Sequence, residues 1–373
     1  QSISDQFEIL ELIGRGSFGN VRKVVRKMDG KLFVRKEISY ISMNPKERSQ
    51  LIAEFRILRE LKHPNIVQYI HHDHIPEDHM VHLYMEYCDG GDLGGIIRKC
   101  RNNGEYVPEE IVWSIFTQIL LALYRCHYGT ESPPVGLNNL FNSNGDPPPS
   151  TIDQRNVVIH RDIKPDNVFL LKDNFVKLGD FGLAKMLNHE NDFAKTYVGT
   201  PYYMSPEVLL DKPYDPVCDI WSLGCVIYEL CSLHPPFQAK SHVQLQEKIK
   251  EGIFSPMPDH YSNKLKKVIS ACIMVNPQDR PSAYQLLQDT SVKIFRKDLE
   301  FKYKEIALRE YEKELLNRDQ LLLRSEEDLN SKLAEELDYQ RKAVEQEVEE
   351  IRRGYQNEFE FVVEKEVETR FNK

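Results

Sequence analysis

The sequence predicts an α+β protein with a β-rich lobe, an α-rich lobe and a long C-terminal helix. Residues 7–37 alternate apolar and polar side chains in short runs broken by glycines, which is typical of a small twisted sheet. After about residue 92 the apolar spacing becomes predominantly helical. Residues 296–373 hold 16 basic and 22 acidic residues and neither proline nor cysteine, so this segment differs in kind from the rest. We therefore predict a β-rich lobe over 1–88, an α-rich lobe over 89–295 and a helical tail.

The overall composition excludes several classes of protein. With 373 residues, of which 41% are hydrophobic, the chain can bury a substantial core, so wholesale disorder is excluded. The net charge of −9 argues against direct nucleic-acid binding as the main role. No apolar run approaches the length of a membrane span and the first residues show no signal peptide, so we expect no membrane association. Seven cysteines without a CxxC pair favour a reduced, intracellular protein.

Within the lobes, turn residues separate the predicted elements. A helix is expected between Asn44-Pro45 and His63-Pro64, because apolar residues recur there at helical spacing. The α-rich lobe has four long amphipathic segments, at 109–127, 216–234, 241–251 and 262–290. Residues 129–156 are rich in proline, asparagine and glycine and should bury little, either as a tolerated surface insertion or as a regulatory docking segment.

A glycine-rich run near the N-terminus is the first candidate site. Its members are Gly14, Arg15, Gly16, Ser17, Phe18, Gly19, Asn20 and Val21. Glycines let a backbone pass close to phosphates with its N–H groups free to donate. The same spacing occurs in dinucleotide-binding folds and in plain hairpins, but a dinucleotide site needs a helix to follow, and here a strand follows. Lys36 lies on the next strand, on a face from which its ammonium could reach the α and β phosphates.

The next helix carries a charge in an unusual place. Glu54 shares its apolar stripe with Leu51 and Leu58 rather than lying on the polar face. A carboxylate there is costly unless it is paired. Glu54 is therefore either a rim residue that extends its carboxylate into solvent or the partner of Lys36 in an ion pair.

Three polar motifs follow in the α-rich lobe. They are HRDIKPDN at 160–167, GDFG at 179–182 and GTPYYMSPE at 199–207. Asp162 is placed to accept a hydroxyl proton, and Asn167 and Asp180 offer the oxygen ligands that Mg²⁺ prefers. Each motif alone could be an ordinary turn, but their occurrence in this order after the glycine run and Lys36 makes a chance match remote.

The complete set resembles the protein-kinase signature over about residues 7–290. The finer strings at 178–185, 193–196 and 198–207 are similar to those of the NIMA-related (never in mitosis) family. The resemblance implies a bilobal protein kinase fold and a non-specific serine/threonine protein kinase. Such an enzyme uses ATP and Mg²⁺ to phosphorylate serine and threonine hydroxyls of protein substrates.

The resemblance also implies a role for each motif residue. Asp162 would be the catalytic base, Lys164 a cation near the transferred phosphate, and Asn167 and Asp180 the magnesium ligands. Lys36 and Glu54 would form an activating ion pair. The residues expected to enclose adenine are Ile13, Val21, Val34 and Phe169, with Met85 as gatekeeper and the backbone of Glu86 and Cys88 as the hinge.

Regulation and cellular role follow from the same resemblance. Arg161 beside the base suggests control by an activation-loop phosphate, with Thr196 as the preferred site and Thr200 as a second candidate with a more structural role. Glu207 and Arg280 resemble the buried structural pair of kinases, and Asp219 resembles their support for the catalytic loop. The family implies a mitotic, cell-cycle role in the cytoplasm or nucleus, including the spindle pole or the cytoskeleton.

Two further features of the sequence admit more than one interpretation. His71, His72, His74, His79 and His82 crowd one segment, which favours a solvated hairpin loop over a metal site or a pH-sensitive site because no fixed ligand spacing appears. Cys126-His127 has no third partner in the sequence and is interpreted as a helix end.

The tail has coiled-coil spacing. Leu308, Leu315, Leu322 and Leu329 lie seven residues apart, and the apolar series continues to Tyr355 with a phase shift. The companion positions of the heptad are mostly polar, so a single solvated helix is the alternative; these positions are Tyr311, Arg318, Ser325 and Lys332. We expect a homodimer through residues 296–373. A different class of function, a nucleotide-binding scaffold whose tail mediates assembly, is the alternative to an enzyme.

Overall fold

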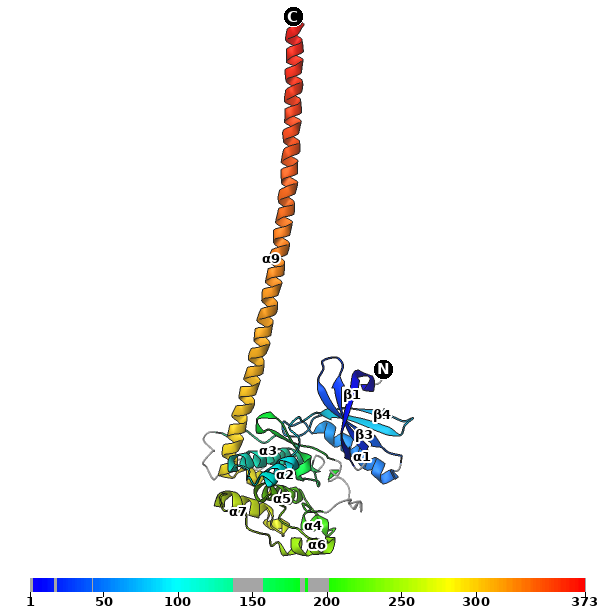
Figure 1. The fold of residues 1–373 in the computed structure, drawn as a ribbon, viewed down its shortest axis with the longest axis vertical. Helices are drawn as coiled ribbons and strands as arrows, with labels where there is room; N and C mark the ends of the chain where they lie inside the picture. Colours follow the sequence, from blue (N-terminus) through cyan, green and yellow to red (C-terminus); the bar gives the residue numbers. More distant parts are fainter. Residues whose placement is uncertain are drawn as a thin grey trace. The chain divides into compact units, whose positions relative to one another are not determined.

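A computed structural model describes residues 3–16, 19–41, 43–136, 157–181, 185–186 and 201–372. Residues 1–300 and 301–373 form two compact units (Figure 1). None of the helices in the described part of the chain is both long enough and apolar enough to cross a membrane.

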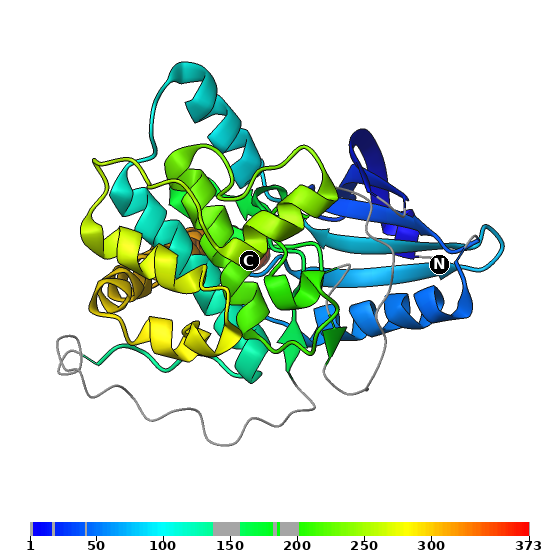
Figure 2. The same ribbon diagram turned by 90° about the horizontal axis from the view of Figure 1, so that it is seen from below.

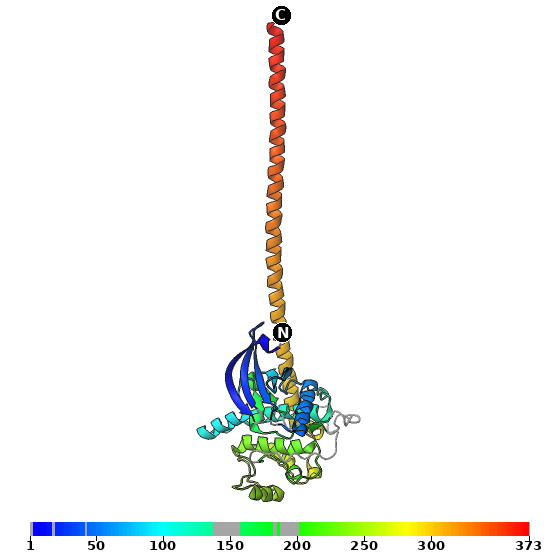
Figure 3. The ribbon, with the colours of Figure 1, turned by 90° about the vertical axis from the view of Figure 1, so that its right-hand side faces the viewer.

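The β-rich lobe is built on one five-stranded antiparallel sheet with the strand order β1-β2-β3-β5-β4. Its elements are η1 (Ile3–Gln6), β1 (Phe7–Gly16), β2 (Gly19–Arg26), β3 (Leu32–Ser39), α1 (Pro45–Glu60), β4 (Tyr69–Ile75) and β5 (Met80–Glu86). The predicted small sheet and the predicted helix after Asn44 are both present. Helix α1 runs alongside the strands in Figure 2 and contacts β4, and Figure 3 shows how strongly the first strands curve.

The two faces of the sheet have different environments. Phe7, Val24, Phe33 and Tyr84 form a small apolar cluster on one face. The alternate residues of β3 and β5, among them Leu83, belong to the other face, where Leu83 joins the main core. Because side chains alternate along a strand, Lys36 lies on the same face as its cross-strand partner Leu83.

The α-rich lobe is organised around helices whose buried surfaces are largely apolar. Its helices are α2 (Leu93–Asn103), α3 (Glu109–Tyr128), α4 (Pro206–Leu209), α5 (Val217–Ser232), α6 (His242–Glu251), α7 (Asn263–Cys272) and α8 (Ala283–Leu287). Two pairs of short strands are also present: β6 (Val158–Ile159) with β9 (Lys185–Met186), and β7 (Val168–Leu170) with β8 (Val176–Leu178). Three 3-10 turns connect other elements, namely η4 (Pro165–Asn167), η5 (Lys172–Asn174) and η6 (Pro277–Asp279). Nearly every residue of α5 is buried, as expected for a helix at the centre of a lobe.

Two sequence predictions for this lobe were wrong in part. The continuous helical segment at 262–290 is instead α7, η6 and α8, because Pro277 and Pro281 cannot donate the backbone hydrogen bonds of a helix. The segment at 129–156 does not begin as a solvated excursion, since Val135 is buried and its N–H donates to Glu300 (2.8 Å). Residues 137–156 lie outside the described part of the chain.

Helix α9 (Thr290–Phe371) is 82 residues long and uninterrupted (Figures 1 and 3). Its first turns belong to the first unit, where Lys293, Arg296 and Leu299 are buried. The Arg296 guanidinium donates to the Pro133 carbonyl (2.6 Å) and the Leu287 carbonyl (3.2 Å). Residues 304–372, by contrast, are all exposed, including the predicted leucine series.

Candidate active site

The glycine-rich run forms the hairpin between β1 and β2. Gly14 pairs with Val21 and Gly16 with Gly19, while Ser17 and Phe18 lie outside the described residues. A Cβ added to Gly19 would lie 1.6 Å from the Glu37 carbonyl oxygen on β3, a distance that no side chain can occupy. At Gly14 the nearest atom would be 3.7 Å away, an ordinary contact. Glycine is therefore required at position 19 by the close packing of β2 on β3.

Lys36 reaches the GDFG motif. Its ammonium donates to Asp180 Oδ1 at 3.0 Å. Burial opposes ionisation of Asp180, but the neighbouring Lys36 outweighs it and the pKa of this carboxyl is lowered. Glu54 lies on α1 as predicted, but its side chain is outside the described part, so the Lys36–Glu54 ion pair stays a prediction.

The catalytic-loop motif brings three of the predicted residues into direct contact. Asp162 Oδ2 accepts hydrogen bonds from Lys164 Nζ (2.7 Å) and from Asn167 Nδ2 (3.0 Å). Asn167 Nδ2 also donates to the Asp162 carbonyl (2.7 Å), and the Gly179 N–H donates to the Asn167 carbonyl (3.0 Å). These bonds hold the predicted base, its neighbouring cation and the GDFG motif together.

The oxygen atoms here suit a magnesium ion that binds with its nucleotide. Asn167 uses its amide nitrogen for the bonds to Asp162, so its amide oxygen is the atom that could bind a cation, and the Asp180 carboxylate supplies charge. Within the described ranges no group of three or more His, Cys, Asp or Glu side chains could hold a metal ion. Mg²⁺ held by Asn167 and Asp180 would take its other ligands from phosphate and water, as this ion prefers.

A buried aspartate fixes the backbone of this loop. Asp219 of α5 accepts hydrogen bonds from the backbone N–H groups of His160 and Arg161 and from His127 Nε2, each at 2.9 Å. Burial opposes its ionisation, but the bond from His127 lowers the pKa of the Asp219 carboxyl. Arg161 has φ of 63°, a strained value for a residue with a side chain, and its bond to Asp219 stabilises it. The predicted supporting role of Asp219 is confirmed.

Two histidines in this network were missed by the sequence reasoning. His127 is buried on α3 and bonded to Asp219, so it is more than a helix end. The His160 ring lies 4.5 Å from the Phe181 ring, its Nδ1 accepts from the Asp162 N–H (3.3 Å) and its Nε2 donates to the Gly179 carbonyl (3.2 Å). A fully apolar helix face that contains a histidine is the signal that could have indicated His127.

The residues predicted to surround adenine come from five strands and, for Cys88, from the segment after β5. Ile13 lies on β1, Val21 on β2, Val34 on β3 opposite Met85, and Phe169 on β7. The Glu86 carboxylate accepts from the Gln68 N–H (2.9 Å) and from Lys177 (3.0 Å), so its side chain is occupied within the protein. Burial raises the pKa of the Cys88 thiol to about 12. Thr196 and Thr200 lie outside the described residues.

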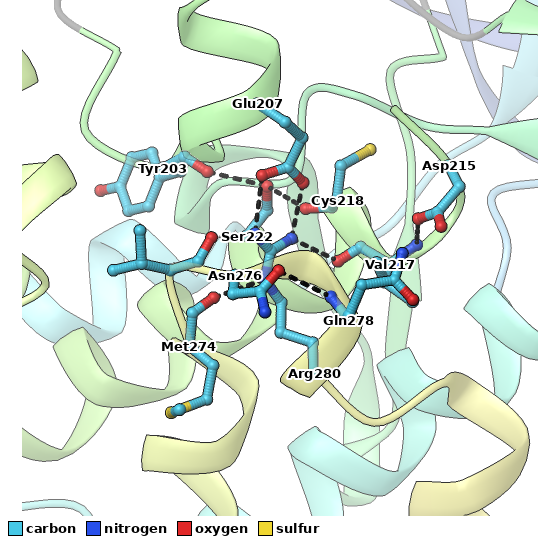
Figure 4. Close-up of polar contacts among 11 residues, drawn as sticks. Tyr203, Glu207, Asp215, Val217, Cys218, Ser222, Met274, Asn276, Gln278 and Arg280 are labelled. Atoms are coloured by element: carbon cyan, nitrogen blue, oxygen red, sulfur yellow. Dashed lines mark hydrogen bonds and ion pairs between the residues drawn. The ribbon is translucent and has the colours of Figure 1, made fainter. Parts of the chain in front are cut away.

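The predicted pair Glu207–Arg280 is present and buried (Figure 4). Arg280 donates from both terminal nitrogens to the two Glu207 oxygens, each at 2.6 Å. The remaining guanidinium bonds go to the carbonyls of Met274, Val217 and Val275. The pair fastens the GTPYYMSPE segment to the turn at η6.

The sequence matches the family described as protein kinase domain over residues 7–130 and 152–292. Among its relatives is the G2-specific protein kinase nimA of Emericella nidulans, 48% identical over 318 residues, which are 84% of this chain and 45% of the relative. The G2-specific protein kinase nim-1 of Neurospora crassa is 50% identical over 334 residues, or 89% of this chain and 38% of the relative. Human serine/threonine-protein kinase Nek2 is 44% identical over 290 residues, or 77% of this chain and 60% of the relative.

These matches agree with the motifs and their geometry. The chain spans about half the length of these curated relatives. The chain belongs to the protein kinase family, and its predicted resemblance to the NIMA-related serine/threonine kinases is confirmed.

Proposed function

We propose that this protein transfers the γ-phosphate of ATP to serine and threonine hydroxyls of other proteins. The observation that supports this most directly is the contact of Asp162 with Lys164 and Asn167. The Asn167 carbonyl in turn accepts a hydrogen bond from Gly179 of the GDFG motif, and Asp180 of that motif binds Lys36. A carboxylate with two donors on one oxygen keeps its other oxygen for a substrate hydroxyl. Asp162 is therefore placed to accept the hydroxyl proton, next to the cations Lys164 and Lys36 that could neutralise phosphate charge.

Each residue would act mainly by position and charge. Asp162 would orient the hydroxyl and accept its proton, while Lys164 would stabilise charge on the transferred phosphoryl group. Lys36 would bind the α and β phosphates and the hairpin from Gly14 to Gly19 would cover them. Asn167 and Asp180 would hold Mg²⁺, which neutralises phosphate charge when bound. Little covalent chemistry is required of the protein, so preorganisation carries most of the rate enhancement.

The test is transfer of labelled phosphate from ATP to a mixed peptide substrate, followed by identification of the modified amino acids. We expect phosphoserine and phosphothreonine with little phosphotyrosine, and loss of transfer when EDTA removes Mg²⁺. Nucleotide binding without any transfer, under conditions in which the chain is folded, would instead support the scaffold alternative. Modification mainly on tyrosine would contradict the proposed specificity.

We also propose that three segments divide the work: 1–88 and 89–295 as the two catalytic lobes and 296–373 as a dimerisation helix. The support is the apolar series of the tail, which is exposed in a single chain. An isolated helix gains little stability without packing, and a long exposed apolar stripe is typical of an interaction surface. Two copies held together would phosphorylate each other at high effective concentration, with Thr196 as the proposed site.

The dimer is tested by sedimentation of the full chain. Val348→Lys places a charge in the apolar series and should weaken self-association at least about tenfold. Gln346→Lys, two residues earlier and on roughly the opposite side of the helix, is the matched control and should associate like wild type. A wild-type chain that stays monomeric at high concentration would remove the dimer and with it the proposed activation in trans.

The cellular role is proposed from the relatives. Two of them are named G2-specific kinases, so we propose that this chain acts in the cell cycle, in the cytoplasm or nucleus, including the spindle pole or the cytoskeleton.

A further inference from the structure

The crowded histidines do not lie in a loop as the sequence suggested. His71, His72 and His74 are on β4, His82 is on β5, and the turn between these strands contributes His79. His72 and His74 lie on one face of the sheet and His71 and His82 on the other. The rings of the neighbours His71 and His72 nevertheless stack, with centroids 5.7 Å apart. The ring of His72 contacts α1.

His72 contacts both helix α1 and a neighbouring residue of its own strand. Its ring stacks on the Phe55 ring of α1, with centroids 5.2 Å apart and the planes 16° from parallel. The Tyr69 hydroxyl lies 2.6 Å from Nδ1 of His72, and in the neutral tautomer that carries its proton on Nε2 this nitrogen accepts the hydroxyl hydrogen bond. Both Phe55 and Tyr69 pack against the main core, so His72 joins the helix to the sheet at a partly buried interface.

A β-bulge makes this arrangement possible. Residues three apart on a regular strand point to opposite faces. The register shifts between Tyr69 and His71, where two steps along β4 match one step along β5, so Tyr69 and His72 share a face.

The strand pairing also places His72 in the same cross-strand row as Lys36, the lysine predicted to bind phosphate. His72 is opposite Leu83, and Leu83 is opposite Lys36, so all three lie in one row on one face of the sheet. Two strand spacings separate His72 from Lys36, a distance of about 10 Å. On the helix, Phe55 directly follows Glu54, the predicted partner of Lys36. A shift of α1 at Phe55 would therefore move the residue expected to orient Lys36.

We propose that His72 is a positioning residue that clamps α1 to the sheet only in its neutral form, and that its protonation weakens binding of ATP phosphates at Lys36. This inference rests on the function proposed above. An imidazolium has no acceptor for the Tyr69 hydroxyl, and its charge would lie near Arg59 of α1.

The surrounding groups set the direction of the pH dependence. Burial lowers the pKa of His72 from its ordinary value of 6.5, His71, Arg59 and His74 lower it further, and Asp73 opposes them. Because the folded state disfavours the proton, the pKa of folded His72 lies below 6.5. The clamp is therefore intact at neutral pH and is lost only as the pH falls through this lowered pKa.

The experiment compares the affinity for MgATP and the KM for ATP between about pH 7.5 and pH 5.5, a range that spans histidine titration. His72→Asn keeps an acceptor for Tyr69 but cannot titrate. We expect wild type to lose at least about twofold more affinity than His72→Asn on acidification, with the loss in KM rather than in kcat. His72→Phe keeps the ring but not the acceptor and should be weakened at both pH values. His79→Asn, at an exposed position in the turn between β4 and β5, is the matched control and should behave as wild type.

Hydrogen exchange of the backbone amides in α1 gives a readout that does not depend on transfer. After correction for intrinsic rates, α1 of wild type should open more readily at the lower pH, and α1 of His72→Asn should not. Equal acid sensitivity of wild type and His72→Asn in both measurements would overturn the inference. Absence of phosphate transfer with pH-dependent α1 exchange would contradict only the proposed function.

Discussion

Replacing Asp162 by asparagine is expected to lower the rate of phosphate transfer by about 10²- to 10⁴-fold without unfolding the chain. The asparagine oxygen can still accept from Lys164 and Asn167, which donate to Asp162 at 2.7 and 3.0 Å, so the loop should keep its shape. What is lost is the negative charge that would accept the hydroxyl proton. The effect should therefore appear in kcat, while the affinity for MgATP changes little.

Asp166→Asn is the matched control for this prediction. Asp166 is a second carboxylate of the same motif, but it is exposed and lies 3.5 Å from Arg98 rather than beside Lys164. Loss of its charge should leave kcat within about threefold of wild type, since it has no place in proton transfer. If Asp162→Asn retained more than a tenth of wild-type kcat, the role of Asp162 as base would be wrong.

The contrast between these two aspartates illustrates what the sequence could and could not predict. Motif order and spacing were enough to indicate Asp162, Lys164 and Asn167, because all three lie on one short loop whose chemistry is local. The network around Asp219 depends instead on α3 and α5 meeting in the core, so the sequence near His127 could mark this residue as unusual but could not identify Asp219 as its partner. Which residues form such buried pairs depends on how distant helices pack, and the periodicity of the sequence does not predict that packing.

The same limit applies to the fold. Alternation and helical spacing predicted the sheet, α1, α3 and α5, whose patterns are strong. They did not predict the bulge in β4 that brings Tyr69 and His72 to one face, because a register shift arises from the pairing of two strands. Nor did they predict that Val135 would be buried against the start of α9, since that contact joins segments far apart in sequence.

Glu207→Ala is expected to reduce the free energy of unfolding of the catalytic unit by about 3–5 kcal/mol, because it leaves the Arg280 guanidinium buried without its anion. The Arg280 side chain is fully buried and that of Glu207 is 5% exposed, so water cannot replace the lost partner. The three carbonyls that also bind Arg280 satisfy its hydrogen bonds but not its charge. The indole of Trp221, 5.2 Å from the guanidinium, adds cation–π stabilisation that depends on the same position of Arg280.

The measurement is urea unfolding followed by fluorescence of Trp113 and Trp221, the two tryptophans of the chain. Glu11→Ala is the matched control: it also removes a carboxylate from an ion pair, with Lys23 at 3.2 Å, but that pair is on the surface and its loss should shift the midpoint far less. Arg280→Lys should be nearly as harmful as Glu207→Ala, because an ammonium cannot form two parallel bonds to the carboxylate and still reach the three carbonyls.

A double variant separates the charge of the pair from its packing. Glu207→Leu with Arg280→Met replaces both ions by apolar side chains, and well-packed apolar replacements of buried ion pairs are often close to neutral in stability. The double variant should therefore be much more stable than the sum of the two single losses implies. Additive losses would mean that packing and the carbonyl bonds of Arg280, rather than an uncompensated buried charge, account for the cost of breaking the pair.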